Sequence, residues 1–184
     1  MESLLNSLRY STSKVHSAIH NNHILNACQE KKITLNEYKQ MLWAFYKPWR
    51  DLIPNINKLK IPELKPKLVI RHHKIYDDLI HLNINPSNLV LNNESQLSEK
   101  EILGILYVVL GSSMGSKQLA TNLKQTLKNI PYTYLAMSPK EAGWDILTNY
   151  LKSQTDSDYS VSNKAAITTF KIIDLELSNT KNMI

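Results

Sequence analysis

The feature that most constrains this chain is the placement of its glycines. Its 184 residues include only four glycines, and three of them, Gly104, Gly111 and Gly115, fall in the segment LGILYVVLGSSMGSKQLATNL. Gly111 and Gly115 are separated by one helical turn and so share a helix face. Each glycine costs roughly 0.5–1 kcal/mol against alanine in a helix interior. Their shared face therefore predicts a close approach to the backbone, either by another helix or by a flat ligand.

Composition and periodicity predict an all-α fold, a single-domain multi-helix bundle over residues 1–184. Long apolar stretches carry helical spacing, and no alternating strand-like runs are bounded by turns. The one cysteine, Cys28, excludes an intrachain disulfide framework and fits a reducing compartment. Neither a signal-peptide pattern nor an apolar run of about 18 residues is present, so we expect a cytoplasmic protein without a membrane span.

The net charge of +6 predicts a solvated basic surface, because the lysines are scattered along the chain and form no tail or motif. A docking face for an acidic electron carrier, or for an anionic ligand, is the alternative that the charge leaves open. Nucleic acid is not expected as a partner, since no basic cluster marks a binding surface.

About six helices are expected. Capping boxes of the form S/T-x-x-E begin at Thr34, Ser98 and Ser138. The stretches 22–33, 83–96 and 153–160 read as polar connections or loops. Four of the expected helices cover 2–21, 65–82, 98–127 and 161–178. A further helix begins at 34 and is ended by Pro54, and another begins at 138 and includes Leu151.

The first helix carries three residues that point to chemistry: Arg9, Thr12 and His16. Arg9 and His16 are two helical turns apart and share a face. A lone histidine beside an apolar stripe is usually a surface or core residue, and an axial metal ligand is the rarer alternative. His20, one turn beyond His16, could serve as ligand in its place.

A planar macrocycle between two helices would need three things from a protein. One helix must offer a metal ligand, the facing helix must lie close without side chains, and cations at the rim must meet the carboxylates of the macrocycle. His16, the pair Gly111 and Gly115, and Arg9 meet these three requirements.

These segments resemble those of a known family. LRYSTSKVH, residues 8–16, is similar to the proximal-helix motif of heme oxygenases, a Leu, a basic residue and then T-x-x-x-H. LYVVLGSSMGSKQL, residues 106–119, resembles their distal-helix motif Y-V-x-E-G-S-x-L-G-G. LNEYKQMLWAFYKPW resembles their L-x-x-Y-x-x-x-L-x-x-x-Y helix. The resemblance covers nearly the whole chain and is nearest to the compact bacterial enzymes, including those that accompany phytochromes.

The resemblance implies an all-α fold that holds heme, as both substrate and cofactor, between the proximal and distal helices. It implies cleavage of heme by oxygen, with electrons from a ferredoxin or a reductase, to biliverdin, carbon monoxide and ferrous iron. His16 then matches the iron ligand, Gly111 and Gly115 match the flexible distal glycines, and Arg9 matches the partner of a propionate. We expect a monomer.

Small polar groups of the glycine-bearing helix are candidates for holding water near bound oxygen: Ser112, Ser113 and Ser116. Tyr107, one turn before Gly111, could face heme or pack in the core. The chain departs from the family motif at Leu110, where the family has Glu, and at Ser116 and Lys117. These departures put regiospecificity and rate in question more than heme binding.

Two other functions remain open. The first is a heme carrier or sensor on the same fold that has lost turnover, which the departures at Leu110 and Ser116 would explain. The second is a thiaminase-like hydrolase, which would need a pocket cysteine and paired carboxylates, whereas Cys28 lies in a polar connection without a matched acid. His72, His73 and His81 are expected at the surface and not as a metal cluster.

Overall fold

A computed structural model describes residues 2–86, 96–155 and 158–179 of the chain. Within these ranges the chain forms ten α-helices and one 3-10 helix and contains no strand, which confirms the all-α prediction for the described residues. The elements are α1 (Leu4–Ile19), α2 (His23–Gln29), α3 (Leu35–Leu52), η1 (Ile53–Lys58), α4 (Lys65–His81), α5 (Glu99–Gly111), α6 (Ser113–Thr126), α7 (Thr133–Ala136), α8 (Pro139–Ala142), α9 (Trp144–Ser153) and α10 (Ser160–Ser178).

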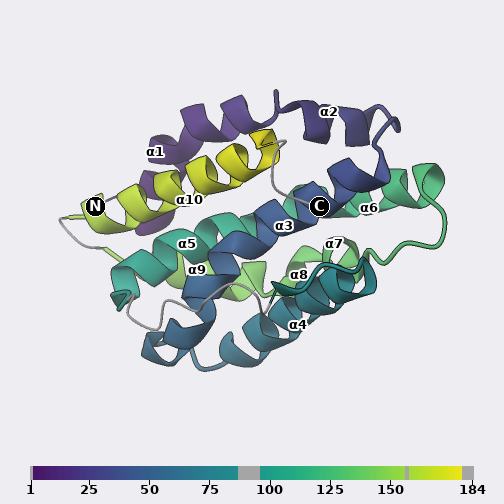
Figure 1. Cartoon of the computed structure of the whole chain (residues 1–184). Coiled ribbons are helices and arrows are strands. Elements are labelled where there is room, and N and C mark those ends of the chain that lie inside the picture. The colour runs from purple at the N-terminus through teal and green to yellow at the C-terminus, as the bar shows by residue number, and fades with distance from the viewer. Residues whose placement is uncertain (1, 87–95, 156–157, 180–184) are drawn as a thin grey trace.

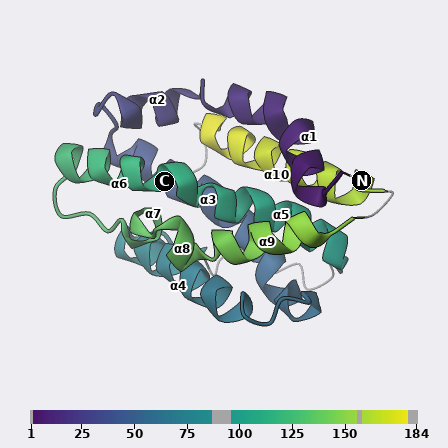
Figure 2. The ribbon, with the colours of Figure 1, turned by 180° about the vertical axis from the view of Figure 1, so that it is seen from behind.

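The helices are arranged around α10 and α5, which share the most extensive helix–helix contact of the fold. Helix α10 also packs against α1 and α3. In Figures 1 and 2, α1 and α2 lie along one edge of the molecule and α4 lies along the opposite edge, with α10, α3, α5 and α6 between them. The glycine-bearing segment is therefore central to the bundle.

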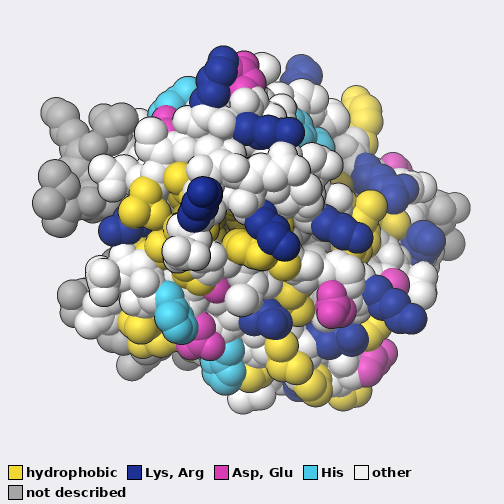
Figure 3. Space-filling view, turned by 90° about the vertical axis from the view of Figure 1, so that its right-hand side faces the viewer, with side chains coloured by type: hydrophobic (Ala, Val, Ile, Leu, Met, Phe, Trp, Pro, Cys, Tyr) yellow, Lys and Arg dark blue, Asp and Glu magenta, His cyan; other side chains and the backbone are white. Residues whose placement is uncertain are grey.

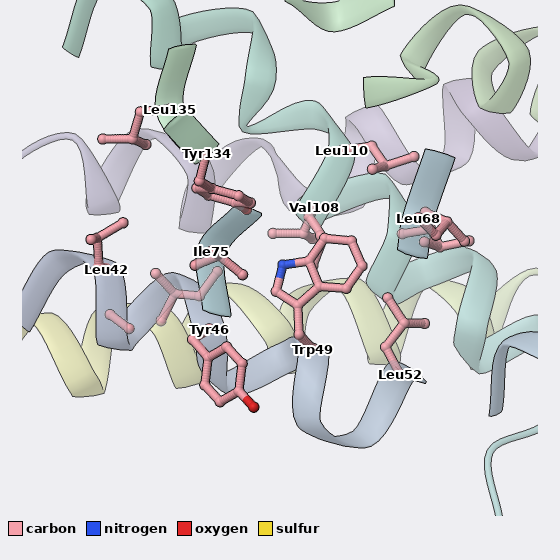
Figure 4. Packing of buried hydrophobic residues seen from close by; sticks show 14 of the residues in the cluster. Leu42, Tyr46, Trp49, Leu52, Leu68, Ile75, Val108, Leu110, Tyr134 and Leu135 are labelled. Atoms are coloured by element: carbon pink, nitrogen blue, oxygen red, sulfur yellow. The ribbon is translucent and has the colours of Figure 1, made fainter. Parts of the chain in front are cut away.

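Part of the core lies where α3 packs against α4 and α5. Trp49 of α3 is completely buried, and Figure 4 shows its indole between Val108 of α5 and Leu68 of α4. Leu110 of α5 is buried beside them. Burial of such a side chain stabilises a fold by roughly 1.5–3 kcal/mol, so this region fixes α5 firmly against the rest of the bundle.

The three predicted capping boxes are confirmed. At Thr34 the hydroxyl accepts from the Glu37 backbone N–H at 3.3 Å, and the Glu37 carboxylate accepts from the Thr34 N–H at 2.7 Å. Ser98 and Ser138 make the same reciprocal pair with the glutamate three residues later. Each box satisfies backbone donors that a helix start leaves unpaired.

The prediction of a polar connection over 22–33 is wrong, because α2 occupies most of it. Asn22 caps this helix by accepting from the Ile24 backbone N–H at 3.0 Å. Ile24, Leu25 and Cys28 are buried on one face. The short apolar stripe becomes a helix because it can pack against α3 and α6.

The long helix expected over 98–127 is divided into α5 and α6 at Ser112. The Ser112 hydroxyl donates to the Val109 carbonyl at 2.7 Å, and the Ser113 hydroxyl donates to Leu110 O at 2.6 Å. Serine side chains that bond to backbone carbonyls three or four residues earlier compete with the helix ladder and bend helices. The break falls beside Gly111.

The helix expected to run on from Ser138 is also divided. Helix α8 ends after one turn at Gly143, whose φ of 87° is left-handed, and α9 begins at Trp144. A Cβ at position 143 would overlap the Leu64 side chain. Glycine is required here both by the backbone angle and by the space.

The expected loops are only partly open to test. Most of 83–96 and residues 156–157 of the stretch 153–160 lie outside the described residues. The helices predicted over 2–21, 65–82 and 161–178 agree closely with α1, α4 and α10.

Among the described residues, one apolar stretch is long enough to cross a membrane by length and composition. Over Glu99–Thr126, a window of 18 residues reaches a mean hydropathy of 1.2, and 56% of that window is buried inside the fold. Because a buried core helix meets the same criterion, this stretch is weak evidence for a span.

Candidate functional site

A cavity of about 570 Å³ lies between a wall formed by α1 and α10 and a wall formed by α5 and α6. A volume in this range is typical of sites for small organic molecules and cofactors. Its lining is mostly apolar: Arg9, His16, Ile19, His20, Leu25, Gln29, Phe45, Tyr107, Val108, Gly111, Ser112, Met114, Gly115, Leu119, Trp144, Phe170 and Ile173.

Two histidines line this cavity: His16 of α1 and His20, the residue that caps the C-terminal end of α1. The ring of His16 is 4.8 Å from the ring of His20 in an edge-to-face arrangement and 5.6 Å from the ring of Phe170. Partial burial lowers the pKa of His16, and the nearby His20 lowers it further. His16 therefore favours the neutral imidazole, the form that can donate a lone pair to a metal.

Arg9, an exposed residue of α1, lines the same cavity. Within the part of the chain that the structure describes, Arg9 forms no ion pair. A guanidinium without an internal partner can form a charge-assisted hydrogen bond to a ligand carboxylate.

The glycines prove to serve two different purposes. A Cβ on Gly104 would overlap the Ser162 carbonyl oxygen and the Ala165 side chain of α10, so this glycine allows two helices to pack closely. Gly115 lines the cavity, and nothing lies within 4 Å of the position that its Cβ would take. On the face that the sequence singled out, the Trp144 side chain lies 3.4 Å from the Cβ position of Gly111, and Gly115 opens on the cavity. The close approach of a second helix occurs instead at Gly104.

The hydroxyl groups near the cavity are already engaged as donors. Ser112 lines the cavity and donates to Val109 O, and Ser113 donates to Leu110 O. Ser113 is buried and does not line the cavity. The Ser112 hydroxyl also accepts from Nη2 of Arg71 at 3.2 Å, so its remaining lone pair makes Ser112 an acceptor toward the cavity.

Two predicted site residues lie behind the lining. Thr12 is buried, and its hydroxyl donates to the Leu8 carbonyl at 2.7 Å. Ser116 is buried and donates to the Ser113 carbonyl at 3.2 Å. Neither residue borders the cavity. The structure does bring six others to it: Arg9, His16, Tyr107, Gly111, Ser112 and Gly115.

Aromatic rings close the cavity at several points. The ring of Tyr107 is 5.8 Å from that of Trp144, and both residues line the cavity. Phe170 of α10 does so beside His16. Helical periodicity shows that residues such as Trp144 and Phe170 face inward, but not whether they meet a core or a cavity.

Arg71 of α4 was missed altogether. It is completely buried, and its Nη2 donates to the Ser112 hydroxyl at 3.2 Å. An arginine on an amphipathic helix is ordinarily a surface residue, so no signal in the sequence could have found it.

The expectation that His72 is at the surface is wrong, while His73 and His81 are exposed as expected. His72 is half-buried among the rings of Tyr46, Trp49 and Tyr76. Burial lowers its pKa to about 4, with a smaller contribution from His73. No group of three or more potential metal ligands occurs among the described residues.

Cys28 is buried beneath α6 and does not line the cavity. Burial raises the pKa of its thiol to about 11, which disfavours the nucleophilic thiolate. Among the described lining residues there is no carboxylate. The described lining is thus mostly apolar and carries an imidazole, and it contains neither a thiol nor a carboxylate.

The basic side chains of one face of the molecule do not form a single cluster. Figure 3 shows Lys and Arg spread across one face of the molecule among acidic and uncharged side chains. This distribution agrees with the solvated basic surface that the sequence predicts.

Comparison with solved structures shows what this fold is similar to. A heme oxygenase from Leptospira interrogans matches with a TM-score of 0.72 at 18% identity, over 96% of this chain and 99% of that chain. Heme oxygenase-1 from the cyanobacterium Synechocystis, in complex with heme, matches with a TM-score of 0.65 at 15% identity, over 96% of this chain and 91% of that chain.

A third solved structure has the same fold under another name. A TenA homologue from P. horikoshii matches with a TM-score of 0.67 at 14% identity, over 96% of this chain and 97% of that chain. No protein-family model and no curated protein matches the sequence. The chain therefore has a heme oxygenase-like all-α fold.

Proposed function

We propose that this chain is a heme oxygenase that cleaves heme, with oxygen and external electrons, to biliverdin, carbon monoxide and ferrous iron. Gly111 and Gly115 form part of the cavity lining, which we call the glycine wall. The observation that carries the proposal is that the His16 imidazole and this glycine wall line one apolar cavity, with open space beside Gly115. The fold, shared with a heme oxygenase that was crystallised with heme, supports it.

His16 is the proposed iron ligand. Its lowered pKa keeps the imidazole neutral near pH 7, and the edge of the Phe170 ring restricts its orientation. His20 borders the same cavity, but the T-x-x-x-H register of the family motif selects His16.

The rest of the cavity would position the macrocycle. Gly115 leaves the space that a flat molecule needs beside α6. Arg9 would bind a propionate at the rim. When bound, heme supplies the iron and is itself the molecule oxidised.

Ser112 is the residue proposed to hold a water molecule that can supply a proton in the cavity. Because its hydroxyl donates to Val109 O, it offers the cavity a lone pair and can accept a hydrogen bond from water. Water held in this way keeps a proton available at the glycine wall.

Titration of the purified protein with hemin, followed by ascorbate or a ferredoxin system in air, tests the proposal by absorption spectroscopy. A one-to-one Soret band that decays into a broad red biliverdin band is expected. The absence of any Soret band would exclude the heme proposal, and the cavity would then belong to another ligand.

A heme carrier or sensor is the second candidate. It is favoured by Leu110, which is completely buried in the core at the position where the family motif has Glu and so supplies no polar group to the site. A Soret band that persists under reductant and air would identify this function.

The remaining features of the proposal follow from the family resemblance. A ferredoxin or a reductase would supply the electrons and oxygen would be the second substrate. The protein would act as a single-domain cytoplasmic monomer. A thiaminase-like hydrolase is disfavoured because the described lining has neither a thiol nor a carboxylate.

A further inference from the structure

Besides the glycine wall, the fold has another unusual feature, a buried positive charge on α4 next to that wall. Arg71 of α4 has no exposed surface. In the described part of the chain it forms no ion pair, and its Nε and Nη1 atoms have no hydrogen-bond partner. Buried charges are ordinarily paired with an opposite charge, so this arginine requires an explanation beyond packing.

The partners that Arg71 does have converge on the break between α5 and α6. Its Nη2 donates to the Ser112 hydroxyl at 3.2 Å and makes a longer contact of 3.5 Å with Val109 O. The Ser112 hydroxyl donates to the same carbonyl. Arg71 thus closes a triangle of polar contacts around the one residue that separates the two helices.

The guanidinium is held in place from its other side. It lies 4.2 Å from the centre of the Tyr134 ring, a cation–π contact. Tyr134 is in turn fixed through its backbone N–H, which donates to the buried carboxylate of Asp78 at 2.9 Å. Asp78 also lies on α4, so α4 and α7 together clamp the guanidinium against Ser112.

We propose that Arg71 is the positioning residue of the glycine wall: through Ser112 it holds the break between α5 and α6, and it places an unneutralised positive charge directly behind the cavity. Ser112 is the only residue between the guanidinium and the cavity in this chain of contacts. The unpartnered Nε and Nη1 donors call for internal water, which would extend the polar contacts around the junction.

Two consequences separate this role from simple packing. An uncompensated buried charge is unfavourable for folding, so an apolar side chain of similar length should not destabilise the protein. The order of the α5–α6 junction, by contrast, should depend on the charge. Stability and local order are thus expected to respond in different ways to one substitution.

The first experiment uses the protein without heme. Amide hydrogen exchange over residues 108–116 is measured in the parent, R71M, R71K and R50M. R50M is the matched control, because Arg50 is a part-exposed arginine paired with Asp51. R71M should raise exchange at the junction by about tenfold or more while the melting temperature holds or rises. R71K, which keeps a cation, should restore part of the protection, and R50M should leave the junction unchanged.

The second experiment rests on the proposed function and uses the ferric heme complex. Azide is titrated as an anionic probe of the cavity and imidazole as a neutral one. A positive charge behind Ser112 favours the anion, so R71M should weaken azide binding by about tenfold, an effect of about 1.4 kcal/mol, and leave imidazole binding nearly unchanged.

Unchanged exchange at the junction in R71M would overturn the positioning role, and equal losses of azide and imidazole would overturn the electrostatic one. A fall in melting temperature in parallel with faster exchange throughout the chain would show that Arg71 is merely structural. If the parent bound no heme, the proposed function would fail, but the exchange experiment would still decide the role of Arg71.

Discussion

The indole of Trp144 lies 3.4 Å from the position that a Cβ on Gly111 would take, so a side chain of α9 covers one of the two glycines of the cavity wall. Trp144 is the first residue of α9, which begins directly after Gly143, whose left-handed φ ends α8. Gly111 is thus in ordinary contact with protein, while Gly115 faces open space. The two glycines of the motif are therefore not equivalent.

Replacement of Gly115 by alanine should stabilise the protein and impair the site. The methyl group meets nothing within 4 Å, and alanine gains up to about 0.5–1 kcal/mol over glycine within a helix. The same methyl group narrows the space for a flat ligand. Thermal unfolding and a hemin titration measure the two effects. A variant that bound hemin as well as the parent would show that this glycine does not serve the ligand.

Gly104→Ala should have the opposite effect and so provides the matched comparison. Its methyl group would overlap the backbone and Ala165 of α10, and overpacking of this kind typically costs about 1–3 kcal/mol. We expect a lower melting temperature and little change in hemin affinity at temperatures where the variant is folded. A stable Gly104→Ala variant would mean that α5 and α10 can separate without penalty.

His16→Ala should abolish the normal ligation of heme iron, because it removes the imidazole whose neutral form the site favours. His20→Ala, one turn away on the same wall, is the control and should keep the parent spectrum of the ferric complex. Optical and electron paramagnetic resonance spectra of both complexes measure the difference. Loss of the spectrum in His20→Ala alone would assign the ligand to His20.

Arg9→Glu should weaken heme binding by about tenfold, the equivalent of about 1.4 kcal/mol, because a carboxylate would replace the proposed partner of a propionate. Lys14→Glu, a charge reversal at another exposed position of α1 that does not line the cavity, is the control. The dimethyl ester of heme lacks the carboxylates and should bind Arg9→Glu and the parent with similar affinity. An equal loss with heme and its ester would argue against the propionate contact.

His72 should make the stability of the fold depend on acid. Its pKa is lowered to about 4 in the folded chain, against about 6.5 when unfolded. The unfolded state therefore binds the proton more readily, and stability is fully present above about pH 6.5 and falls as the pH drops toward 4. With allowance for solvent screening of this half-buried ring, the loss should be about 1–2 kcal/mol.

Denaturant unfolding between pH 4 and 7 measures this dependence. His72→Phe should flatten it, whereas His81→Gln, at an exposed position on the same helix, should leave it as in the parent. A parent protein of constant stability over this range would show that His72 titrates normally in the fold.

The parts of this protein that could be predicted depend on contacts between near neighbours in the sequence. The capping boxes at Thr34, Ser98 and Ser138 join residues three apart, so their residue types alone identify the helix starts. The shared face of Arg9 and His16, and that of Gly111 and Gly115, follows from the helical repeat. These local rules predicted the all-α fold, and together with the resemblance to the heme oxygenase motifs they predicted six of the residues that line the cavity.

Tertiary packing decided the rest. The chain could not reveal that Arg71 is buried, because its contact with Ser112 joins positions 41 residues apart. It also could not separate Gly104, which admits α10, from Gly115, which opens on the cavity, since both are glycines on one apolar segment. Helical periodicity determines which residues share a face, but the partner that covers this face is set by packing between helices distant in sequence, and that packing alone made one glycine a helix contact and the other a wall of the site.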